Sequence, residues 1–397
     1  MNMKKYFKIT ILMLTVGLCF SCSDDDDSIT TGSYIPKEVT ISDWGTADKP
    51  ATWGNEIVVT GDGFSASTEL YLRPAESNID PDKGISLEIV DRNAGSIKFL
   101  APLAGGNSEY ELLQVEGDLV YSLGTIYLKD EKFPSRLVGP VNNNEWGVSA
   151  SYMDFKYERG KLMEIKEFST SDQFGTSEGS CYTFIYDGDR ISSLVKSQMG
   201  ELVVKTYTFE YKGNTVLVKS DESGYVRTMA LTLNNDGVMT SRTEEWEQSN
   251  PIFDEDTWEI IGEYTDYYKD VYAYTYDAQG NMSGYTVQNL MNGDQISDSY
   301  MQIKYDSKHT LLPHILPDWF WTLTSTEIFN YMIGYTNNVM SYTVPGGSGP
   351  FGRADNEVTI SYELEYDKDE YPAYIYTLNE MFDGSIEKFK LYDVVYN

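Results

Sequence analysis

The chain has 397 residues, with 62 acidic and only 30 basic side chains, and its formal net charge is −32 at pH 7. This balance excludes nucleic acid as an expected partner, because phosphate binding is driven by lysine and arginine side chains. A chain of this length can bury the cores of two or three domains.

Residues 1–21 are expected to be an export signal peptide. Three lysines, Lys4, Lys5 and Lys8, precede an apolar run that is shorter than the roughly 20 apolar residues needed to span a bilayer. The run ends in Cys-Phe-Ser-Cys, which resembles the lipobox of bacterial lipoproteins. The resemblance implies that Cys22 carries acyl chains and begins the mature protein. Cys181 would then be the remaining cysteine, and no disulfide is expected within the chain.

Residues 22–35 are expected to form an acidic leader. Its first residues resemble the export signal of Bacteroidota-type surface lipoproteins, and they are Ser23, Asp24, Asp25, Asp26 and Asp27. The resemblance implies a place on the outer face of the outer membrane, with the acyl chains as the membrane contact. The alternative is a solvated spacer, which like-charge blocks usually are. The position of the block directly after Cys22 favours the export signal.

Residues 36–129 consist of short alternating apolar runs separated by glycine, a pattern typical of a small β-sandwich. The segment EIVVTGDGF at 56–64 predicts a strand that leads into a tight turn, and FLAP stands at 99–102. These motifs closely resemble the TIG (IPT) immunoglobulin-like domain. The resemblance implies a non-catalytic spacer or interaction module.

Residues 130–144 are rich in proline, asparagine and charge, and they are expected to be a linker. From 145 to 397 an aromatic triplet followed by an Asp or Gly turn recurs, at several places about 25 to 29 residues apart, which is typical of a repeated supersecondary unit. Each unit predicts a β-hairpin, and stacked hairpins predict a curved antiparallel meander. The tyrosine of each unit should bury its ring and extend its hydroxyl to water at the rim of an open sheet.

The motif Y-D-x-x-G-x-apolar resembles the YD repeats of RHS-type proteins. The whole region also resembles secreted lipoprotein domains of unknown function from the same bacteria, so the resemblance implies architecture and no activity. In large toxins, YD repeats build a shell around a passenger. The copies in this chain are expected to be too few to close one.

Residues 316–335 break the strand pattern, because their apolar and aromatic side chains recur at helical spacing and Asp318 can cap a helix after Pro317. The predicted fold class is therefore all-β. An Ig-like β-sandwich is followed by a larger curved antiparallel β-meander built from hairpin repeats, with one short helix covering part of the sheet.

No catalytic motif is found, and neither a metal nor a cofactor is expected. The two histidines, His309 and His314, are too few for a three-ligand zinc site. The acidic residues between 254 and 259 favour a solvated loop over a calcium site, since their spacing does not match a calcium loop. A glycan hydrolase with a carboxylate pair stays open as the least favoured alternative, because carboxylates are abundant.

Aromatic side chains are the better indication of binding, since the apolar face of a sugar ring can stack on them. The candidate ligand-binding residues are Trp246, Trp258, Trp319 and Tyr264. For Trp319 a place in the core face of the helix is the favoured alternative. The primary hypothesis is a non-catalytic, lipid-anchored cell-surface protein that binds a glycan or a partner protein. The second is a structural accessory subunit of an outer-membrane surface complex.

Overall fold

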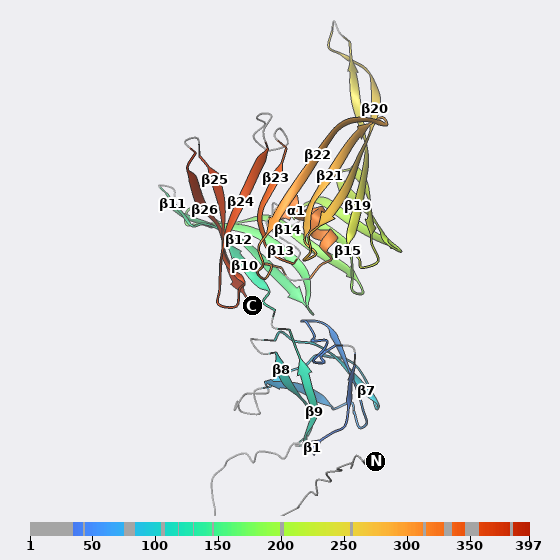
Figure 1. The fold of residues 1–397 in the computed structure, drawn as a ribbon, viewed down its shortest axis with the longest axis vertical. Helices are drawn as coiled ribbons and strands as arrows, with labels where there is room; N and C mark the ends of the chain where they lie inside the picture. Colours follow the sequence, from blue (N-terminus) through green and yellow to red (C-terminus); the bar gives the residue numbers. More distant parts are fainter. Residues whose placement is uncertain are drawn as a thin grey trace, which may run out of the picture.

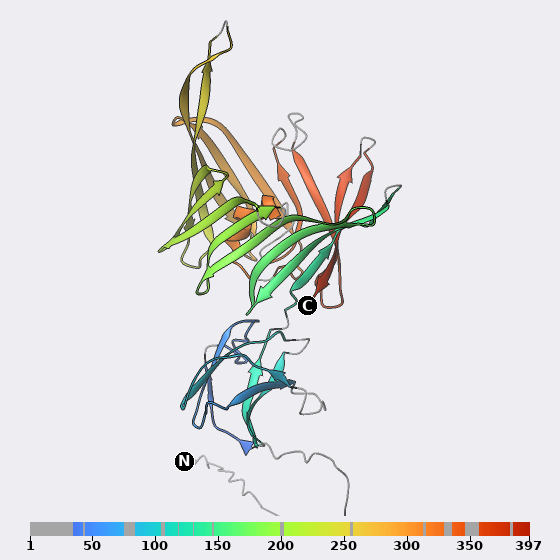
Figure 2. The ribbon, with the colours of Figure 1, turned by 180° about the vertical axis from the view of Figure 1, so that it is seen from behind.

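The computed structural model shows two β-rich units joined end to end, a smaller one that follows the N-terminal segment and a larger one that ends at the C-terminus (Figures 1 and 2). The structure describes residues 35–42, 44–74, 84–104, 108–117, 119–129, 131–144, 147–198, 202–254, 257–312, 315–328, 336–345, 357–381 and 384–397. The predicted signal peptide and nearly all of the acidic leader, with Cys22, Ser23, Asp24, Asp25, Asp26 and Asp27, lie outside these ranges.

The smaller unit consists of two sheets with a shared hydrophobic core. The five-stranded sheet has the order β1 (Ile35–Pro36), β9 (Leu119–Tyr127), β8 (Glu109–Glu116), β4 (Glu69–Pro74) and β5 (Ile85–Ser86). The four-stranded sheet has the order β2 (Thr40–Ser42), β3 (Glu56–Thr60), β7 (Ser96–Leu100) and β6 (Ile89–Asn93). Alternate residues of β3, Ile57 and Val59, are fully buried, as expected for a strand with one face on the core of a sandwich.

The larger unit is an antiparallel meander that closes into a barrel. Its first strands are β10 (Pro134–Val138), β11 (Asn142–Asn144), β12 (Gly147–Glu158), β13 (Lys161–Ser171), β14 (Gly175–Asp187), β15 (Arg190–Gln198), β16 (Leu202–Lys212), β17 (Thr215–Glu222) and β18 (Tyr225–Leu233). They are followed by β19 (Met239–Phe253), β20 (Ile260–Tyr276), β21 (Met282–Met291), β22 (Asp294–Tyr305), β23 (Val339–Val344), β24 (Val358–Tyr366), β25 (Pro372–Glu380) and β26 (Ile386–Tyr396). The predicted all-β class and the antiparallel meander are confirmed.

Closure of the barrel corrects two expectations. Most of the predicted linker 130–144 is strand, because β10 and β11 both pair with β12. The first strand, β10, also pairs with the last, β26, and Leu137 lies opposite Val394. The expectation that the hairpin copies are too few to close a shell is therefore wrong. Strands without the motif, such as β18 and β19, pair in the same meander and complete the ring.

The tyrosines of the repeat hold neighbouring hairpins together. The Tyr186 hydroxyl donates to the backbone oxygen of Leu162 at 2.9 Å, and the Tyr211 hydroxyl donates to that of Ile191 at 3.0 Å. The same bond recurs in Tyr157 to Pro134, Tyr276 to Met239, Tyr305 to Met282 and Tyr396 to Pro372. Each acceptor is the first or second residue of its strand. The expectation that these hydroxyls extend to water is thus wrong. The repeated hydrogen bond links neighbouring hairpins.

The single described helix, α1 (Asp318–Ile328), is inserted into one of the repeat turns. In an ordinary copy, the Asp277 backbone N–H donates to the Asn281 oxygen at 2.9 Å, and the Asn281 amide donates back to the Asp277 carboxylate at 3.1 Å. Asp306 and Asn338 make the same two bonds, both at 3.1 Å. The residues between Asp306 and Asn338, which include α1, therefore take the place of a short hairpin turn.

The helix lies inside the barrel, where the sequence predicted one that covers a face of the sheet (Figures 1 and 2). Phe320 is fully buried, and its ring centroid lies 5.8 Å from those of Phe184 on β14 and Phe209 on β16. Because the sheet closes, its concave side surrounds the core of the barrel, and α1 packs inside this core. Predicted helical residues 329–335 lie outside the described ranges. No helix among the described residues is long and apolar enough to cross a membrane.

The two units meet through a close backbone contact. Gly54 of the smaller unit and Gly160, in the turn between β12 and β13, both have positive φ. A Cβ on Gly160 would lie 2.2 Å from the backbone oxygen of Trp53, so only glycine fits. The Trp53 ring packs on Tyr157 at 5.4 Å, and Arg159 forms an ion pair with Glu88 at 2.5 Å. These contacts orient the barrel on the smaller unit.

Candidate binding pocket inside the barrel

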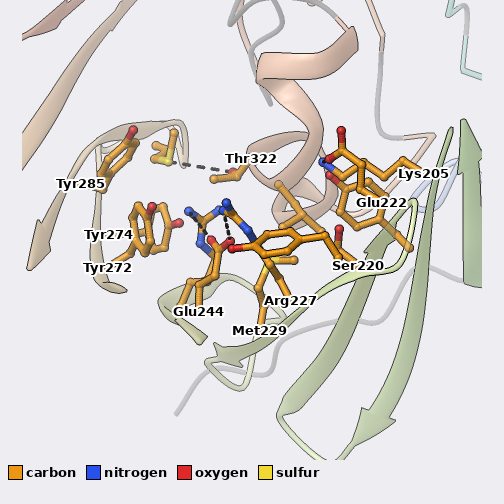
Figure 3. Close-up of a pocket in the computed structure, with 15 residues that line it drawn as sticks. Lys205, Ser220, Glu222, Arg227, Met229, Glu244, Tyr272, Tyr274, Tyr285 and Thr322 are labelled. Atoms are coloured by element: carbon orange, nitrogen blue, oxygen red, sulfur yellow. Dashed lines mark hydrogen bonds and ion pairs between the residues drawn. The ribbon is translucent and has the colours of Figure 1, made fainter. Parts of the chain in front are cut away.

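A pocket of about 340 Å³ opens on the concave side of strands β16 to β21, next to α1 (Figure 3). This volume lies at the lower end of the range for small-molecule sites, roughly 300–1,000 Å³. The wall is polar, with three basic and two acidic side chains among tyrosines and methionines. Thr322 and Leu323 of α1 line one side, so the inserted helix forms part of the site.

The centre of the pocket is a cluster of two arginines around one glutamate. The Arg227 guanidinium donates to Glu244 at 3.0 Å, and a nitrogen of Arg242 lies 3.7 Å from the other Glu244 oxygen. The Arg242 guanidinium also lies over the ring of Tyr272, 3.7 Å from its centroid, a favourable cation–π contact. These contacts fix both cations against the wall of the pocket.

Two polar atoms beside this cluster are buried without a hydrogen-bond partner among the described residues, the Arg242 Nε and the Tyr274 hydroxyl. Tyr274 is 9% exposed. Burial raises the pKa of Tyr272 to about 12 and also raises the pKa of Tyr274, so both hydroxyls carry their protons at neutral pH. A buried donor without an acceptor costs about 1–3 kcal/mol, which a ligand oxygen at this position would recover.

The opposite wall carries a second, smaller polar group (Figure 3). Lys205 of β16 forms an ion pair with Glu222 of β17 at 3.3 Å, and Ser220 lies beside them. Tyr225, at the start of β18, lines this pocket and also a groove of about 610 Å³ next to it. The basic and acidic side chains nearly balance, and the walls offer both donors and acceptors.

A β-bulge explains why the arginines and the glutamate face inward. Leu233 of β18 pairs with Met239, but Thr232 pairs with Ser241, so β19 has one extra residue, Thr240. A bulge moves the residues that follow it to the opposite face of the strand. Sequence analysis named none of the charged residues of the pocket. The available signal was the alternation of Arg242, Glu244 and Trp246, but the face that is inside depends on the bulge.

Trp246, a predicted ligand-binding residue, lies at the edge of this site. Its ring stacks on Tyr268 with centroids 5.3 Å apart and planes 8° apart, and the Arg227 guanidinium lies 4.7 Å from its ring centroid. The indole is thus flanked by Arg227 of β18 and Tyr268 of β20. Trp246 therefore positions Arg227, and Tyr225 offers the more accessible ring at the rim.

The other predicted aromatic residues are not brought together with the pocket. Trp319 is 3% exposed and packs against Phe209 in the core, which removes it from the residues that a surface ligand can reach. Trp258 and Tyr264 are exposed on the part of the β19–β20 hairpin that projects beyond the barrel (Figure 1). They belong to a separate surface.

The structure places the remaining described residues that were considered from sequence apart from the pocket. His309 stacks on Tyr371 with ring centroids 4.5 Å apart, and Cys181 is a half-buried free thiol. His314 and two of the acidic residues between 254 and 259 lie outside the described ranges. Within those ranges, no group of three histidine, cysteine or acidic side chains could hold a metal ion.

Comparisons with solved structures find several similar proteins. A porin-like protein from Bacteroides uniformis is 14% identical, with a TM-score of 0.39 over 66% of this chain and 96% of that chain. A DUF4784 family protein from Bacteroides caccae is 10% identical, with a TM-score of 0.20 over 90% and 95%. An auxiliary nutrient binding protein from Bacteroides thetaiotaomicron is 7% identical, with a TM-score of 0.22 over 91% and 98%.

The chain matches no protein-family profile and no curated protein. The resemblances to TIG domains and YD repeats therefore remain predictions. At such identities and TM-scores the solved structures carry no functional assignment.

Proposed function

We propose that the protein is a non-catalytic binding protein whose barrel pocket holds a neutral saccharide unit. The observation that carries this proposal is the pair of buried donors, Arg242 Nε and the Tyr274 hydroxyl, in a pocket with further acceptors on its walls. A sugar presents hydroxyl groups that both donate and accept, which suits this mixture. The near balance of basic and acidic side chains favours a neutral ligand over a charged one.

A glycan hydrolase is the weaker alternative. Glu222 and Glu244 both line the pocket, so two carboxylates are present. Each of them, however, forms an ion pair with basic side chains, Glu222 with Lys205 and Glu244 with Arg227. Glycoside hydrolysis needs one protonated acid and one free base or nucleophile across the scissile bond. These two ion pairs are better suited to a binding site, in which each carboxylate is held by a fixed counter-charge.

A single-atom variant tests the pocket. Tyr274→Phe removes the hydroxyl that has no partner in the described structure, so the free energy of unfolding should stay the same or rise slightly. If the hydroxyl donates to the ligand, saccharide affinity should fall about tenfold, the loss expected for one hydrogen bond. Titration calorimetry with a neutral oligosaccharide selected on a glycan array measures both the affinity and its loss.

Two further variants make this experiment decisive. Tyr225→Ala should weaken the same binding, because Tyr225 offers its ring at the rim, whereas Trp258→Ala on the projecting hairpin should leave it unchanged. Binding that is lost with Trp258→Ala and kept with Tyr274→Phe would place the saccharide elsewhere. A chain that binds no glycan on the array would contradict the proposal.

The proposed location is the outer face of the outer membrane, through acyl chains on Cys22. The support is the lipobox-like ending of the signal and the acidic residues after it. Protease treatment of intact cells should release the chain while a periplasmic control protein survives. Replacing Asp24, Asp25, Asp26 and Asp27 by alanine should protect the chain from the protease. Protection of the unmodified chain would show that the acidic leader is only a spacer.

A further inference from the structure

The β19–β20 hairpin extends far beyond the wall of the barrel (Figures 1 and 2). β19 pairs with β18 only as far as Glu245, and β20 pairs with β21 only from Tyr268 onward. Residues 246–253 and 260–267 therefore pair only with one another in the described part of the sheet. At about 3.3 Å per residue this two-stranded ribbon is roughly 25 Å long.

The base of the ribbon is held in a fixed direction. The buried carboxylate of Asp266 accepts from the side-chain amide of Asn250 at 2.8 Å and from that of Asn292 at 2.7 Å. Asn292 lies in the turn between β21 and β22, and its side-chain oxygen accepts from the Tyr267 backbone N–H at 2.9 Å. The ribbon is thus tied to the next hairpin, so little conformational entropy is lost when its tip binds.

The tip of the ribbon exposes five large apolar side chains. They are Ile252, Phe253, Trp258, Ile260 and Ile261. Trp258 is 77% exposed and has a φ of 58°, and its backbone N–H donates to the Asp254 oxygen at 2.9 Å. Asp254 also accepts from the Thr257 backbone N–H at 2.8 Å. These hydrogen bonds hold the backbone of Thr257 and Trp258, and the Trp258 indole is exposed.

The ribbon around this tip is strongly acidic. Between Trp246 and Tyr267 the sequence has seven acidic side chains and no lysine or arginine. Glu259 and Glu263 are exposed next to the apolar tip. Tryptophan is enriched at interaction hot spots, and a polar rim surrounds the apolar core of an interface.

We propose that the tip of the β19–β20 ribbon docks into a partner protein that offers an apolar groove with lysine or arginine side chains at its rim. Charge complementarity selects this occupant. Anionic lipid and a second acidic ribbon of this chain would both be repelled. A saccharide would meet aromatic rings here without the enclosed polar groups that hold its hydroxyls in the barrel pocket.

Site-specific photocrosslinking in the native host tests this inference. A photoreactive phenylalanine analogue replaces Trp258 in one variant and Phe174 in a control, since Phe174 is 79% exposed in the turn between β13 and β14. One protein, identified by mass spectrometry, should crosslink at 258 and not at 174. No crosslink at 258, or the same crosslinks at both positions, would overturn the proposal.

The identified protein is then purified and its affinity for the full chain is measured. Trp258→Ala should weaken binding at least tenfold, as hot-spot truncations do, and Phe174→Ala should not. Glu259→Lys with Glu263→Lys should slow association, and added salt should slow association of the unmodified chain. Equal affinity of the Trp258→Ala chain, binding of the tip to phosphatidylcholine vesicles, or self-association in sedimentation would each contradict a docked partner protein.

Discussion

Replacing Phe320 by alanine is expected to lower the free energy of unfolding of the barrel by about 3–5 kcal/mol, the usual cost of removing a buried phenylalanine ring. The ring is fully buried between Phe184, Phe209, Trp319 and Trp321, with centroids 5.5–6.1 Å away. The closed barrel cannot collapse onto the vacated space, because the neighbouring wall strands β14 and β16 are each paired on both sides. Equilibrium urea unfolding followed by tryptophan fluorescence measures the loss.

Phe174→Ala is the matched control for this experiment. It removes the same side chain from an exposed turn, and we expect a change within about 0.5 kcal/mol. A loss below about 1 kcal/mol for Phe320→Ala would mean that α1 is not part of the core. The result would then contradict the placement of the helix inside the barrel.

Local features of the structure could be predicted from the sequence. The hairpin units are visible because a turn residue such as Gly188 or Gly213 follows an aromatic triplet within a few positions, and both glycines have positive φ. The helix could be predicted because the helical spacing of its apolar and aromatic side chains is also a local pattern. In each case the residues that determine the element are neighbours in the chain.

Long-range features could not be predicted in the same way. Closure depends on the pairing of Leu137 with Val394, which lie at opposite ends of the barrel sequence, and no local pattern records that register. The position of α1 follows from closure, since a helix beside an open sheet would cover one of its faces. The pocket depends on the single extra residue Thr240, which decides whether Glu244 or Glu245 faces inward.

The second large expected effect on the free energy of unfolding concerns Glu244, the glutamate that the bulge turns inward. Glu244→Gln should lower the free energy of unfolding by about 3 kcal/mol, because the largely buried Arg242 loses its counter-charge. The Glu244 and Arg242 side chains are 11% and 12% exposed. Glu245 forms its ion pair with Lys269 on the outer face, where its side chain is 56% exposed, so Glu245→Gln should cost less than about 1 kcal/mol.

A double variant separates the stability of this cluster from its role in binding. Changing Arg242 and Glu244 together to methionine removes both buried charges, and apolar replacements of a buried ion pair are often neutral or stabilising. Most of the stability lost in Glu244→Gln should therefore return. The double variant should still not bind the saccharide, because it lacks the Arg242 Nε donor. If the double variant is stable and also binds the saccharide, Arg242 only supports the fold. The ligand then does not contact this wall of the pocket.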